Sequence, residues 1–394
     1  MQLDVFTVHV SEKTDWIVLR LTDDAGHIGI GEATLNRHTN AVLAAIAPAV
    51  AATTGAISAE AARAAIARSV AGATGRAIAS GLEQAALDLT GHVTGLPVHA
   101  LLGGAFRRAV PAYANINRGT LTRAPDEFAA RAQKAAAAGY SAVKLAPFDQ
   151  VSPDAPDDHT RESFIEAGLR RIEAVAQQVP DGVRVQIDCH SRFRPDEAEA
   201  MMGEAGERGV RWFEEPIAET AQNRPVLVAL RARAKTLGMT TAGAENAADL
   251  AEFLPFLVAG CYDTVMPDII LAGGPREVVR IGHLAARFGV GVSLHNPCGP
   301  VMDMASACTA AALPELVSLE RQFDESALYD EIVATRAHTF TGGAIRMSDA
   351  PGLGIRLDFS HPAMAWQATH RLAIEPARLA PQAEKSDFVL NNDG

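Results

Sequence analysis

The sequence predicts an α/β protein whose main body is a (β/α)8-type barrel, accompanied by a smaller α+β capping domain. Eight short apolar runs alternate with helical stretches between residues 110 and 322, as in a closed parallel barrel. Seven of the eight runs carry charged or histidine side chains at or near their C-terminal ends, and barrel enzymes place their chemistry at these strand ends. A doubly wound open sheet, the rival fold, more commonly shows fewer strands and a glycine-rich first turn, and neither is evident in this chain.

The N-terminal part of the chain predicts the capping domain. Three runs suit antiparallel strands because their residues alternate or because a turn precedes them. These runs are DVFTVHV (4–10), DWIVLRLTD (15–23) and IGIGEA (28–33). From about residue 40 to 102 the chain is rich in Ala, and Ile, Leu and Val recur at helical spacing, which favours packed helices.

The barrel is expected to follow this region with eight regularly spaced strands. The predicted strands are VPAYAN (110–115), SAVKLAPF (141–148), VRVQIDCH (183–190), GVRWFEEP (209–216), TTAGAEN (240–246), DTVMPDII (263–270), GVGVSLHN (289–296) and ELVSLERQ (315–322). The polar, Pro-rich segment PFDQVSPDAPDDH (147–159) predicts a surface loop over the barrel mouth.

These patterns divide the chain into three parts. We expect a capping domain over residues 1–108, a barrel over 109–330 and a C-terminal segment over 331–394. The last of these begins strand-like and rich in turns, and its polar end, EKSDFVLNNDG, is expected to be mobile.

The composition of the chain indicates which kinds of binding partner to expect. The formal net charge of −12 argues against a nucleic-acid backbone or an anionic membrane surface. The four cysteines form no CxxC pair, which favours a reducing compartment. The N-terminus has no apolar signal-peptide core and no run of eighteen apolar residues occurs. We therefore expect a cytoplasmic protein that acts on a small molecule.

Three carboxylates end the third, fourth and fifth predicted barrel strands: Asp188, Glu214 and Glu245. Neighbouring strands lie about 5 Å apart, so these groups would converge and repel one another. A hard divalent cation with oxygen ligands resolves the repulsion, and Mg²⁺ is the commonest choice. The sequence thus predicts one Mg²⁺ per active site, with salt bridges to barrel Lys or Arg as the alternative for individual carboxylates.

Two histidines, His190 and His295, end the third and seventh predicted strands. In an eight-stranded barrel these strands lie on opposite sides of the mouth, so the two imidazoles could face each other across a substrate. Asp268 ends the sixth strand and could orient His295 and raise its basicity. A lone histidine is more often structural, and His283, inside a predicted helix, is expected to be so.

In their order along the chain, several segments resemble the enolase superfamily, in its mandelate-racemase-like branch. The segments are GHIGIGEA (26–33), ALDLTGHVTGLPVHALLGG (86–104), FEEP (213–216) and DAPGLGIRLD (349–358). The separation of Asp268 and His295 is also similar to that of the family's Asp–His dyad. The resemblance covers nearly the whole chain and implies that the C-terminal segment returns to the capping domain.

The resemblance also implies a role for each residue in the predicted site. Asp188, Glu214 and Glu245 would bind Mg²⁺, which grips a substrate carboxylate, and His295 with Asp268 would be the general base. Lys144 and Glu320 would help to hold the carboxylate oxygens, Lys144 as a cation and Glu320 as a protonated donor. Glu215 points the other way by strand alternation and is expected to be structural.

The second barrel strand departs from the family's pattern. Many relatives carry Lys-x-Lys there, with the second lysine as a base, whereas this chain has Lys144-Leu145-Ala146. DCHSRF (188–193) instead resembles the D-x-H-x-R pattern of sugar-acid dehydratases such as galactonate dehydratase. By this resemblance His190 would be a general acid that protonates the departing 3-hydroxyl, which implies loss of water and a 2-keto-3-deoxy sugar acid.

Other functions stay open at this stage. A sugar-acid lactone cycloisomerase or an epimerase would use the same metal-assisted proton abstraction, and a non-hydroxylated acid is a further substrate class. A non-catalytic sensor or scaffold is the alternative from another class.

Specificity is less well defined by the sequence. By resemblance, capping loops near residues 11–40 and 51–57 would read the distal part of the substrate. The polar candidates are Asn36, Arg37, His38, Asn117, Arg118, Arg192 and Asn296. An exposed Arg or Asn is more often a solvated surface residue, and for Arg192 a surface salt bridge is the alternative. Family members commonly form symmetric homo-oligomers, from dimers to octamers.

Overall fold

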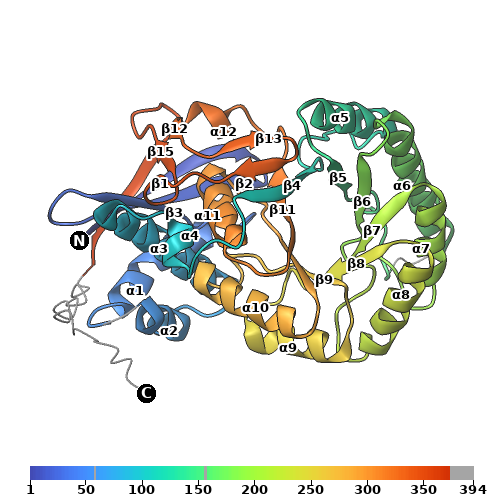
Figure 1. The fold of residues 1–394 in the computed structure, drawn as a ribbon, viewed down its shortest axis with the longest axis horizontal. Coiled ribbons are helices and arrows are strands. Elements are labelled where there is room, and N and C mark those ends of the chain that lie inside the picture. Colours follow the sequence, from blue (N-terminus) through green and yellow to red (C-terminus); the bar gives the residue numbers. More distant parts are fainter. Residues whose placement is uncertain (57–58, 155–157, 373–394) are drawn as a thin grey trace, which may run out of the picture.

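Eight parallel strands close into a barrel, and each coincides with one of the apolar runs predicted from the sequence (Figure 1). The structure is a computed structural model that describes residues 1–56, 59–154 and 158–372. The strands follow one another in chain order, and the last pairs with the first in parallel, with Leu319 opposite Ala112. The predicted (β/α)8-type fold is therefore confirmed.

In the described residues, seven helices connect the eight barrel strands. The strands are β4 (Ala109–Asn115), β5 (Ala142–Leu145), β6 (Arg184–Asp188), β7 (Val210–Glu214), β8 (Thr240–Gly243), β9 (Thr264–Val265), β10 (Gly291–Leu294) and β11 (Leu316–Gln322). The helices are α5 (Pro125–Ala137), α6 (Asp158–Gln178), α7 (Ala198–Glu207), α8 (Arg224–Thr236), α9 (Leu250–Ala259), α10 (Pro275–Arg287) and α11 (Pro300–Ala311). After β11 the described chain forms only the short α12 (Leu328–Glu331) before its C-terminal strands.

Local sequence explains where several of these helices begin. Proline occupies the first or second position of α5, α8, α10 and α11, where its missing N–H costs no intrahelical hydrogen bond. Asp249 precedes α9, and its carboxylate accepts hydrogen bonds from the backbone N–H groups of Ala251 and Glu252 at 2.9 and 3.1 Å. Such N-cap bonds satisfy donors that the first helical turn leaves unpaired.

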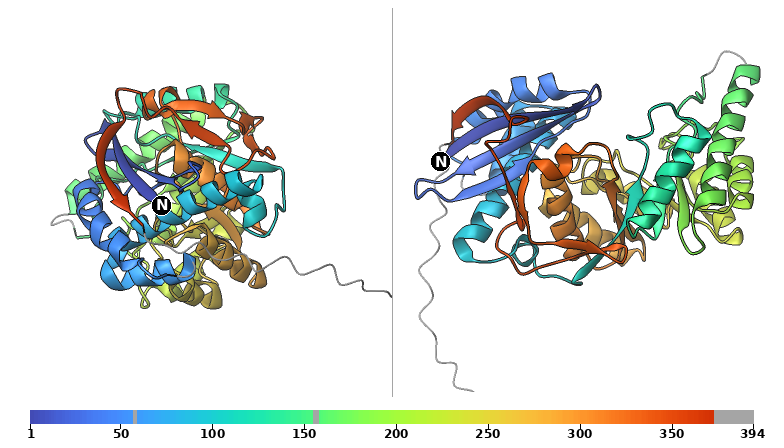
Figure 2. Two further views of the ribbon diagram at one scale, coloured as in Figure 1. Left: turned by 90° about the vertical axis from the view of Figure 1, so that its left-hand side faces the viewer. Right: turned by 90° about the horizontal axis from the view of Figure 1, so that it is seen from above.

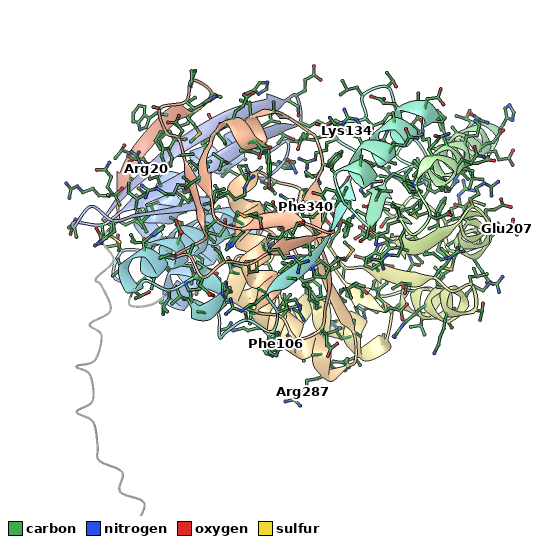
Figure 3. All side chains as sticks on the ribbon, turned by 45° about the horizontal axis from the view of Figure 1, so that its top comes forward. Arg20, Phe106, Lys134, Glu207, Arg287 and Phe340 are labelled. Atoms are coloured by element: carbon green, nitrogen blue, oxygen red, sulfur yellow. The ribbon has the colours of Figure 1, made fainter. Side chains whose placement is uncertain are left out.

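The capping domain is a four-stranded antiparallel sheet in the order β16-β1-β2-β3, with three helices alongside it. Its elements are β1 (Gln2–Ser11), β2 (Thr14–Thr22), β3 (Ile28–Glu32), α1 (Thr39–Ala52), α2 (Ala59–Ser69), α3 (Gly72–Thr94) and β16 (Ala365–Arg371). The C-terminal strand β16 lies against the N-terminal strand β1 (Figure 2), with Gln2 opposite Arg371. The capping sheet, which carries Arg20, and the barrel helix that ends at Glu207 lie at opposite ends of the molecule (Figure 3).

The remaining C-terminal strands join the two parts. The hairpin of β13 (Thr339–Thr341) and β14 (Ala344–Arg346) extends the barrel sheet antiparallel to β4, and β12 (Val333–Arg336) pairs with β15 (Ile355–Leu357). The predicted domain boundaries at residues 108 and 330 stay predictions, and the predicted mobile tail lies outside the described residues. No helix in the described part of the chain is long and apolar enough to cross a membrane.

The two glycines of the IGIGEA segment allow β3 to touch helix α3. A Cβ atom at Gly29 would lie 2.2 Å from the carbonyl oxygen of Ala85, and one at Gly31 would lie 2.0 Å from that of Gly81. Any larger residue would therefore push the strand off the helix. This close contact explains why the segment needs glycine at alternate positions.

The glutamate of the same segment ties the capping domain to the barrel. Glu32 is fully buried, and its carboxylate accepts hydrogen bonds from the backbone N–H groups of Gly299 and Met302 at 2.7 and 3.0 Å. These two groups belong to the N-terminal end of α11, where helix N–H groups lack partners and favour a negative charge. Burial raises the pKa of Glu32, and the donors at Met302 and Gly299 oppose that shift.

Replacement of Glu32 by alanine should therefore weaken the contact between the domains. Two buried N–H groups would lose their acceptor, which should lower the free energy of unfolding by roughly 2–4 kcal/mol. Urea denaturation followed by circular dichroism measures this loss. Glu12→Ala, at an exposed position of the β1–β2 turn, is the control, and equal stability of the two variants would contradict the role given to Glu32.

Candidate active site

A buried lysine lies at the centre of the predicted site. The ammonium group of Lys144, on β5, donates to Glu214 Oε1 at 2.6 Å and to Glu320 Oε2 at 2.8 Å, and Asp188 Oδ2 lies 3.7 Å away. All four side chains are at most 3% exposed. Burial lowers the pKa of Lys144, but Glu214 and Glu320 outweigh it and raise that pKa well above its usual value. Lys144 is therefore a permanent positive charge inside the barrel.

Glu320 is held from several sides. Tyr113 donates to its Oε2 at 2.9 Å, and Asn115 and Gln322 donate to its Oε1 at 2.7 and 3.1 Å. Burial raises the pKa of Glu320, but Lys144 and the other donors lower it to about 2. These contacts favour an ionised carboxylate that accepts hydrogen bonds, and the predicted role of Glu320 as a protonated donor to the substrate stays a prediction.

The predicted contact between His295 and Asp268 is present. His295 Nδ1 lies 2.8 Å from Asp268 Oδ2, and the other oxygen of Asp268 accepts from the backbone N–H of Ile270 at 2.6 Å. The second ring nitrogen of His295 lies 3.4 Å from Glu245 Oε2. Burial lowers the pKa of His295, whereas Glu245 and Asp268 raise it, with a net increase to about 10.

His190 lies at the mouth with a carboxylate on each ring nitrogen. Its Nε2 is 2.9 Å from Asp188 Oδ2, and its Nδ1 is 2.8 Å from Asp149 Oδ1. The backbone of His190 and Ser191 is left-handed, with φ of 45° and 58°, and this tight turn places the ring beside the end of β6. The negative charge of Asp188 raises the pKa of His190 to about 12 although burial opposes the shift.

The carboxylates fit a divalent cation. Ligand atoms of Asp188, His190 and Glu245 lie within 4.8 Å of one another, and Glu245 Oε2 is buried without a hydrogen bond. Burial and Asp188 raise the pKa of Glu245, although His295 opposes them. Oxygen-rich, mutually repelling groups of this kind suit a hard cation such as Mg²⁺.

Glu214 does not belong to that closest group of ligand atoms. Its two oxygens accept from Lys144 and from the indole N–H of Trp212, the latter at 2.7 Å. Glu214 lies directly opposite Asp188 in the β6–β7 pairing, so its backbone is next to the cluster although its carboxylate turns to Lys144. The salt bridge that the sequence left open for single carboxylates is therefore formed at Glu214.

Two of the predicted substrate-binding residues support the backbone around the site. The amide of buried Asn296 donates to Asp303 Oδ1 at 3.1 Å and to the carbonyl oxygen of Glu320 at 3.0 Å. Asn117 accepts from the backbone N–H of Ala146 at 2.5 Å through its side-chain oxygen. The amide nitrogen of Asn296 and the side-chain oxygen of Asn117 are thus already engaged, which favours positioning over substrate binding for these atoms.

Arg37 and Arg192 are two further substrate-binding candidates. Arg37 is exposed after β3, with a left-handed backbone whose N–H donates to the carbonyl oxygen of Lys13. Arg192 is half-buried two residues after His190, and its Nε atom has no hydrogen bond. No interaction found among the described residues joins either side chain to the carboxylates, so their predicted roles stay predictions.

Asp149 is the functional candidate that sequence reasoning missed. It lies in the loop after β5, which was predicted only as a cover over the mouth. The polar composition of that loop was the available signal, but nothing in its spacing pairs Asp149 with His190.

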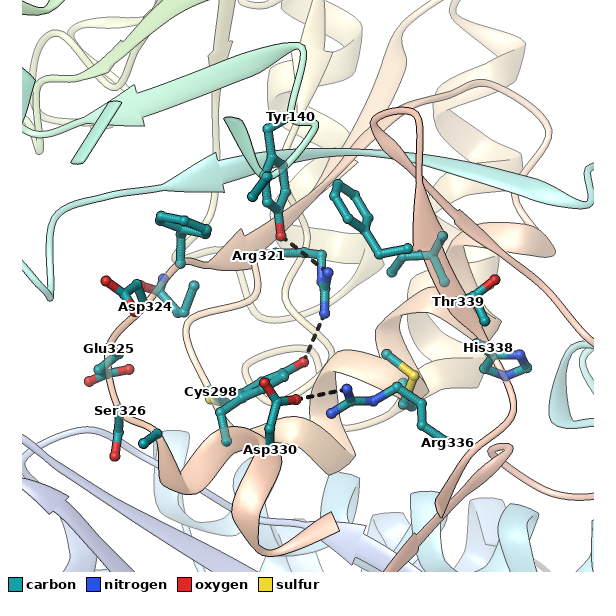
Figure 4. Close-up of a pocket in the computed structure, with 18 of the residues that line it drawn as sticks. Tyr140, Cys298, Arg321, Asp324, Glu325, Ser326, Asp330, Arg336, His338 and Thr339 are labelled. Carbon is teal, nitrogen blue, oxygen red and sulfur yellow. Dashed lines mark hydrogen bonds and ion pairs between the residues drawn. The ribbon is translucent and has the colours of Figure 1, made fainter. Parts of the chain in front are cut away.

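A cavity of about 660 Å³ lies on the outer side of β11 and is separate from this cluster (Figure 4). Its guanidinium groups already have carboxylate partners, since Arg321 pairs with Asp303 at 2.7 Å and Arg336 with Asp330 at 2.9 Å. Arg321 also donates to the Tyr140 hydroxyl at 3.1 Å. The converging carboxylates and histidines at the strand ends are therefore the better candidate for the active site.

Comparison with known families agrees with this geometry. Residues 127–361 match the family described as enolase C-terminal domain-like, and residues 2–103 match the N-terminal domain of mandelate racemase and muconate lactonizing enzyme. The chain belongs to the enolase superfamily. The resemblance inferred from the sequence motifs is thus confirmed.

Several enolase-superfamily relatives carry a named activity. A D-xylonate dehydratase of Haloferax volcanii is 28% identical over 90% of this chain and 86% of its own. A D-galactonate dehydratase of Xanthomonas campestris pv. campestris is 26% identical over 89% of this chain and 91% of its own. A crystal structure from Mesorhizobium loti, at 22% identity, supports the fold with a TM-score of 0.81 over 94% of this chain and 99% of the other.

Removal of the Lys144 ammonium should destabilise the folded barrel. In Lys144→Met the buried carboxylates of Glu214 and Glu320 lose their counter-ion, which should lower the free energy of unfolding at pH 7 by roughly 3–5 kcal/mol. Their folded-state pKa values would then exceed the unfolded ones, so the folded form takes up protons first as pH falls. The deficit relative to the wild type should shrink between pH 7 and pH 5.

Urea denaturation of the variant and the wild type across this pH range measures the difference. Lys13→Met, at an exposed turn, is the matched control and should be nearly neutral. A deficit in Lys144→Met that is absent, or that grows toward pH 5, would show that Lys144 does not neutralise these carboxylates.

Proposed function

We propose that this protein is a Mg²⁺-dependent hydro-lyase that dehydrates a sugar acid. It would remove the α-proton of the substrate, expel the β-hydroxyl as water and yield a 2-keto-3-deoxy sugar acid. The observation that carries the proposal is the pair of imidazoles, His295 and His190, that approach the carboxylates Glu245 and Asp188 from different strands. The dehydratase names of relatives that align with most of the chain support the same class of reaction.

The carboxylates supply the site for the metal. Asp188, Glu214 and Glu245 would hold one Mg²⁺, with Glu214 exchanging its contact with Lys144 for the cation. When bound, Mg²⁺ would stabilise the negative charge that develops on the substrate carboxylate as the α-proton leaves. The unsatisfied Glu245 oxygen and the repulsion among the three groups support this assignment.

One histidine would act as the base of the reaction and the other as the acid. His295 would take the α-proton at Nε2, because its Nδ1 is bonded to Asp268. A base must first be neutral, and a cation bound at Glu245 would offset the negative charge that raises the pKa of His295. His190 would donate a proton from Nε2 to the leaving hydroxyl. Lys144 would neutralise a carboxylate oxygen of the substrate, with Glu320 holding the lysine in place.

The wider setting of the protein is proposed on the same basis. A small anionic substrate is consistent with the lysine and histidines at the strand ends. We further propose a cytoplasmic homo-oligomer, from dimer to octamer, whose partner is this substrate and not a nucleic acid or a membrane.

The metal assignment predicts a large effect of one carboxylate on cation affinity. Glu245→Gln removes a charged ligand, so Mg²⁺ affinity should fall by more than the roughly 10–100-fold typical of a change around, and not among, the ligands. Isothermal titration calorimetry with MgCl₂ measures this. Glu207→Gln, an exposed change on α7 at the far end of the molecule, is the control, and similar affinities would remove Glu245 from the ligand set.

Incubation in deuterium oxide separates the two histidines. A panel of sugar acids is first screened for keto-acid formation by the wild type, and the active substrate is then used with both variants. His295→Asn should lose exchange of the α-proton and dehydration together. His190→Asn should keep exchange while dehydration falls by roughly 10²–10⁴-fold, the usual contribution of a general acid.

Other outcomes of these experiments would contradict the assignments. Exchange that persists in His295→Asn would refute that residue as the base. Exchange without keto-acid formation by the wild type across the panel would favour an epimerase or a lactone cycloisomerase. No turnover and no exchange with any acid would favour a non-catalytic sensor.

A further inference from the structure

Three loops at the barrel mouth supply a chain of contacts that ends on His190. Asp149, in the loop after β5, accepts from His190 Nδ1 at 2.8 Å through Oδ1. Its other oxygen, Oδ2, accepts from Arg123 Nη2 at 2.9 Å. Arg123 belongs to the loop after β4, so the loops after β4, β5 and β6 each contribute one side chain. Both oxygens of Asp149 are therefore committed, and its orientation is fixed.

Arg123, at the other end of this series of contacts, is held by buried residues of the barrel. Arg123 also donates from Nη2 to the carbonyl oxygen of Ala146, and its guanidinium lies over the ring of Phe128 at 4.8 Å. Ala146 and Phe128 are both buried. A guanidinium held by a backbone carbonyl and an aromatic face has little freedom to turn away from Asp149.

A second arginine holds the two loops together. Arg171, on α6, is buried and donates to the carbonyl oxygens of Arg123 at 2.8 Å and Pro147 at 2.6 Å, and to Gln150 Oε1 at 2.6 Å. These three partners bracket the backbone that carries Arg123 and Asp149. The position of Asp149 beside His190 is thus set by the fold and not by a freely moving surface loop.

We propose that Asp149 is the positioning residue for His190 in the dehydration, an inference that rests on the proposed function. By accepting the Nδ1 proton, Asp149 keeps the hydrogen on Nδ1 and leaves Nε2 as the nitrogen that faces the interior of the site. Nε2 already points to Asp188 Oδ2 at 2.9 Å. The arrangement parallels Asp268 and His295 on the other side, so that each histidine has its own aspartate.

In the proposed dehydration each proton and electron pair has a defined destination. His295 Nε2 takes the α-proton, and the electron pair of the broken C–H bond forms a carbon–carbon double bond. The β-carbon–oxygen bond breaks as the Nε2 proton of His190 passes to the departing oxygen, which leaves as water. The enol that remains becomes the keto acid when its O–H proton is lost to solvent and the former β-carbon takes up a proton. His190 is left neutral with its hydrogen on Nδ1, bonded to Asp149.

Asp149→Asn tests the proposal with little change in shape. The amide can present a donor to Nδ1, which favours the opposite tautomer, so kcat for dehydration should fall at least about tenfold while KM changes little. Exchange of the α-proton in deuterium oxide should stay near the wild-type rate, because no contact found in the described residues joins Asp149 to His295. Asp154→Asn, an exposed change in the same loop, should leave both rates unchanged.

A spectroscopic measurement tests the same contact without turnover. In the wild type, ¹⁵N NMR of His190 should show a proton held on Nδ1, and in Asp149→Asn this signal should be lost while the melting temperature stays close to that of Asp154→Asn. An unchanged ¹⁵N signature, or exchange and dehydration that fall together, would overturn the positioning role. A wild type that shows the Nδ1 proton but dehydrates no sugar acid would overturn the proposed function and leave the contact itself intact.

Discussion

The buried ammonium of Lys144 is the interaction on which the arrangement of the site depends. It stands within 4 Å of Glu214, Glu320 and Asp188, all at most 3% exposed, where isolated carboxylates would be strongly destabilised. One positive charge cannot balance these three and Glu245. The remaining negative charge raises the pKa values of His190 and His295 and makes the cluster attractive to a divalent cation. Charge balance thus links the lysine, the histidines and the proposed metal.

The capping domain contributes to the same site through the chain segment that follows the base. Glu32 binds the N-terminal end of α11, four residues after His295 and at the end of the loop that His295 begins. Gly29 and Gly31 press the strand of Glu32 onto α3, so a short segment of the cap is fixed against both its own helix and a barrel helix. A continuous path of packed and hydrogen-bonded backbone therefore runs from the cap to the loop that begins at His295.

Sequence reasoning identified most residues of the candidate site because the signal is local. Apolar runs end where barrel strands open into solvent-facing loops, so the polar residue at each end marks the mouth without knowledge of the fold. Lys144, Asp188, His190, Glu245 and His295 were all found in this way, and the structure brings them together. The pairing of His295 with Asp268 followed from their adjacent strands.

What sequence reasoning could not supply depends on which loops meet. Asp149 reaches His190 only because the loops after β5 and β6 converge, and no periodicity encodes that contact. The ionised state of Glu320 depends on donors from β4, β5 and β11, and the engaged amide of Asn296 depends on Asp303. Residue type identified these groups, but their partners decide what each can do.

The departure at the end of the second strand gains a physical explanation from the same contacts. Ala146, which stands where many relatives carry a lysine base, is buried and has no proton to move. Its backbone N–H donates to Asn117 and its carbonyl oxygen accepts from Arg123, the residue that holds Asp149. On this side of the mouth the position of the lysine base is taken by an alanine, whose backbone holds the contacts that lead through Arg123 and Asp149 to His190. This exchange favours an acid over a second base opposite His295, and therefore loss of water over inversion of the α-carbon.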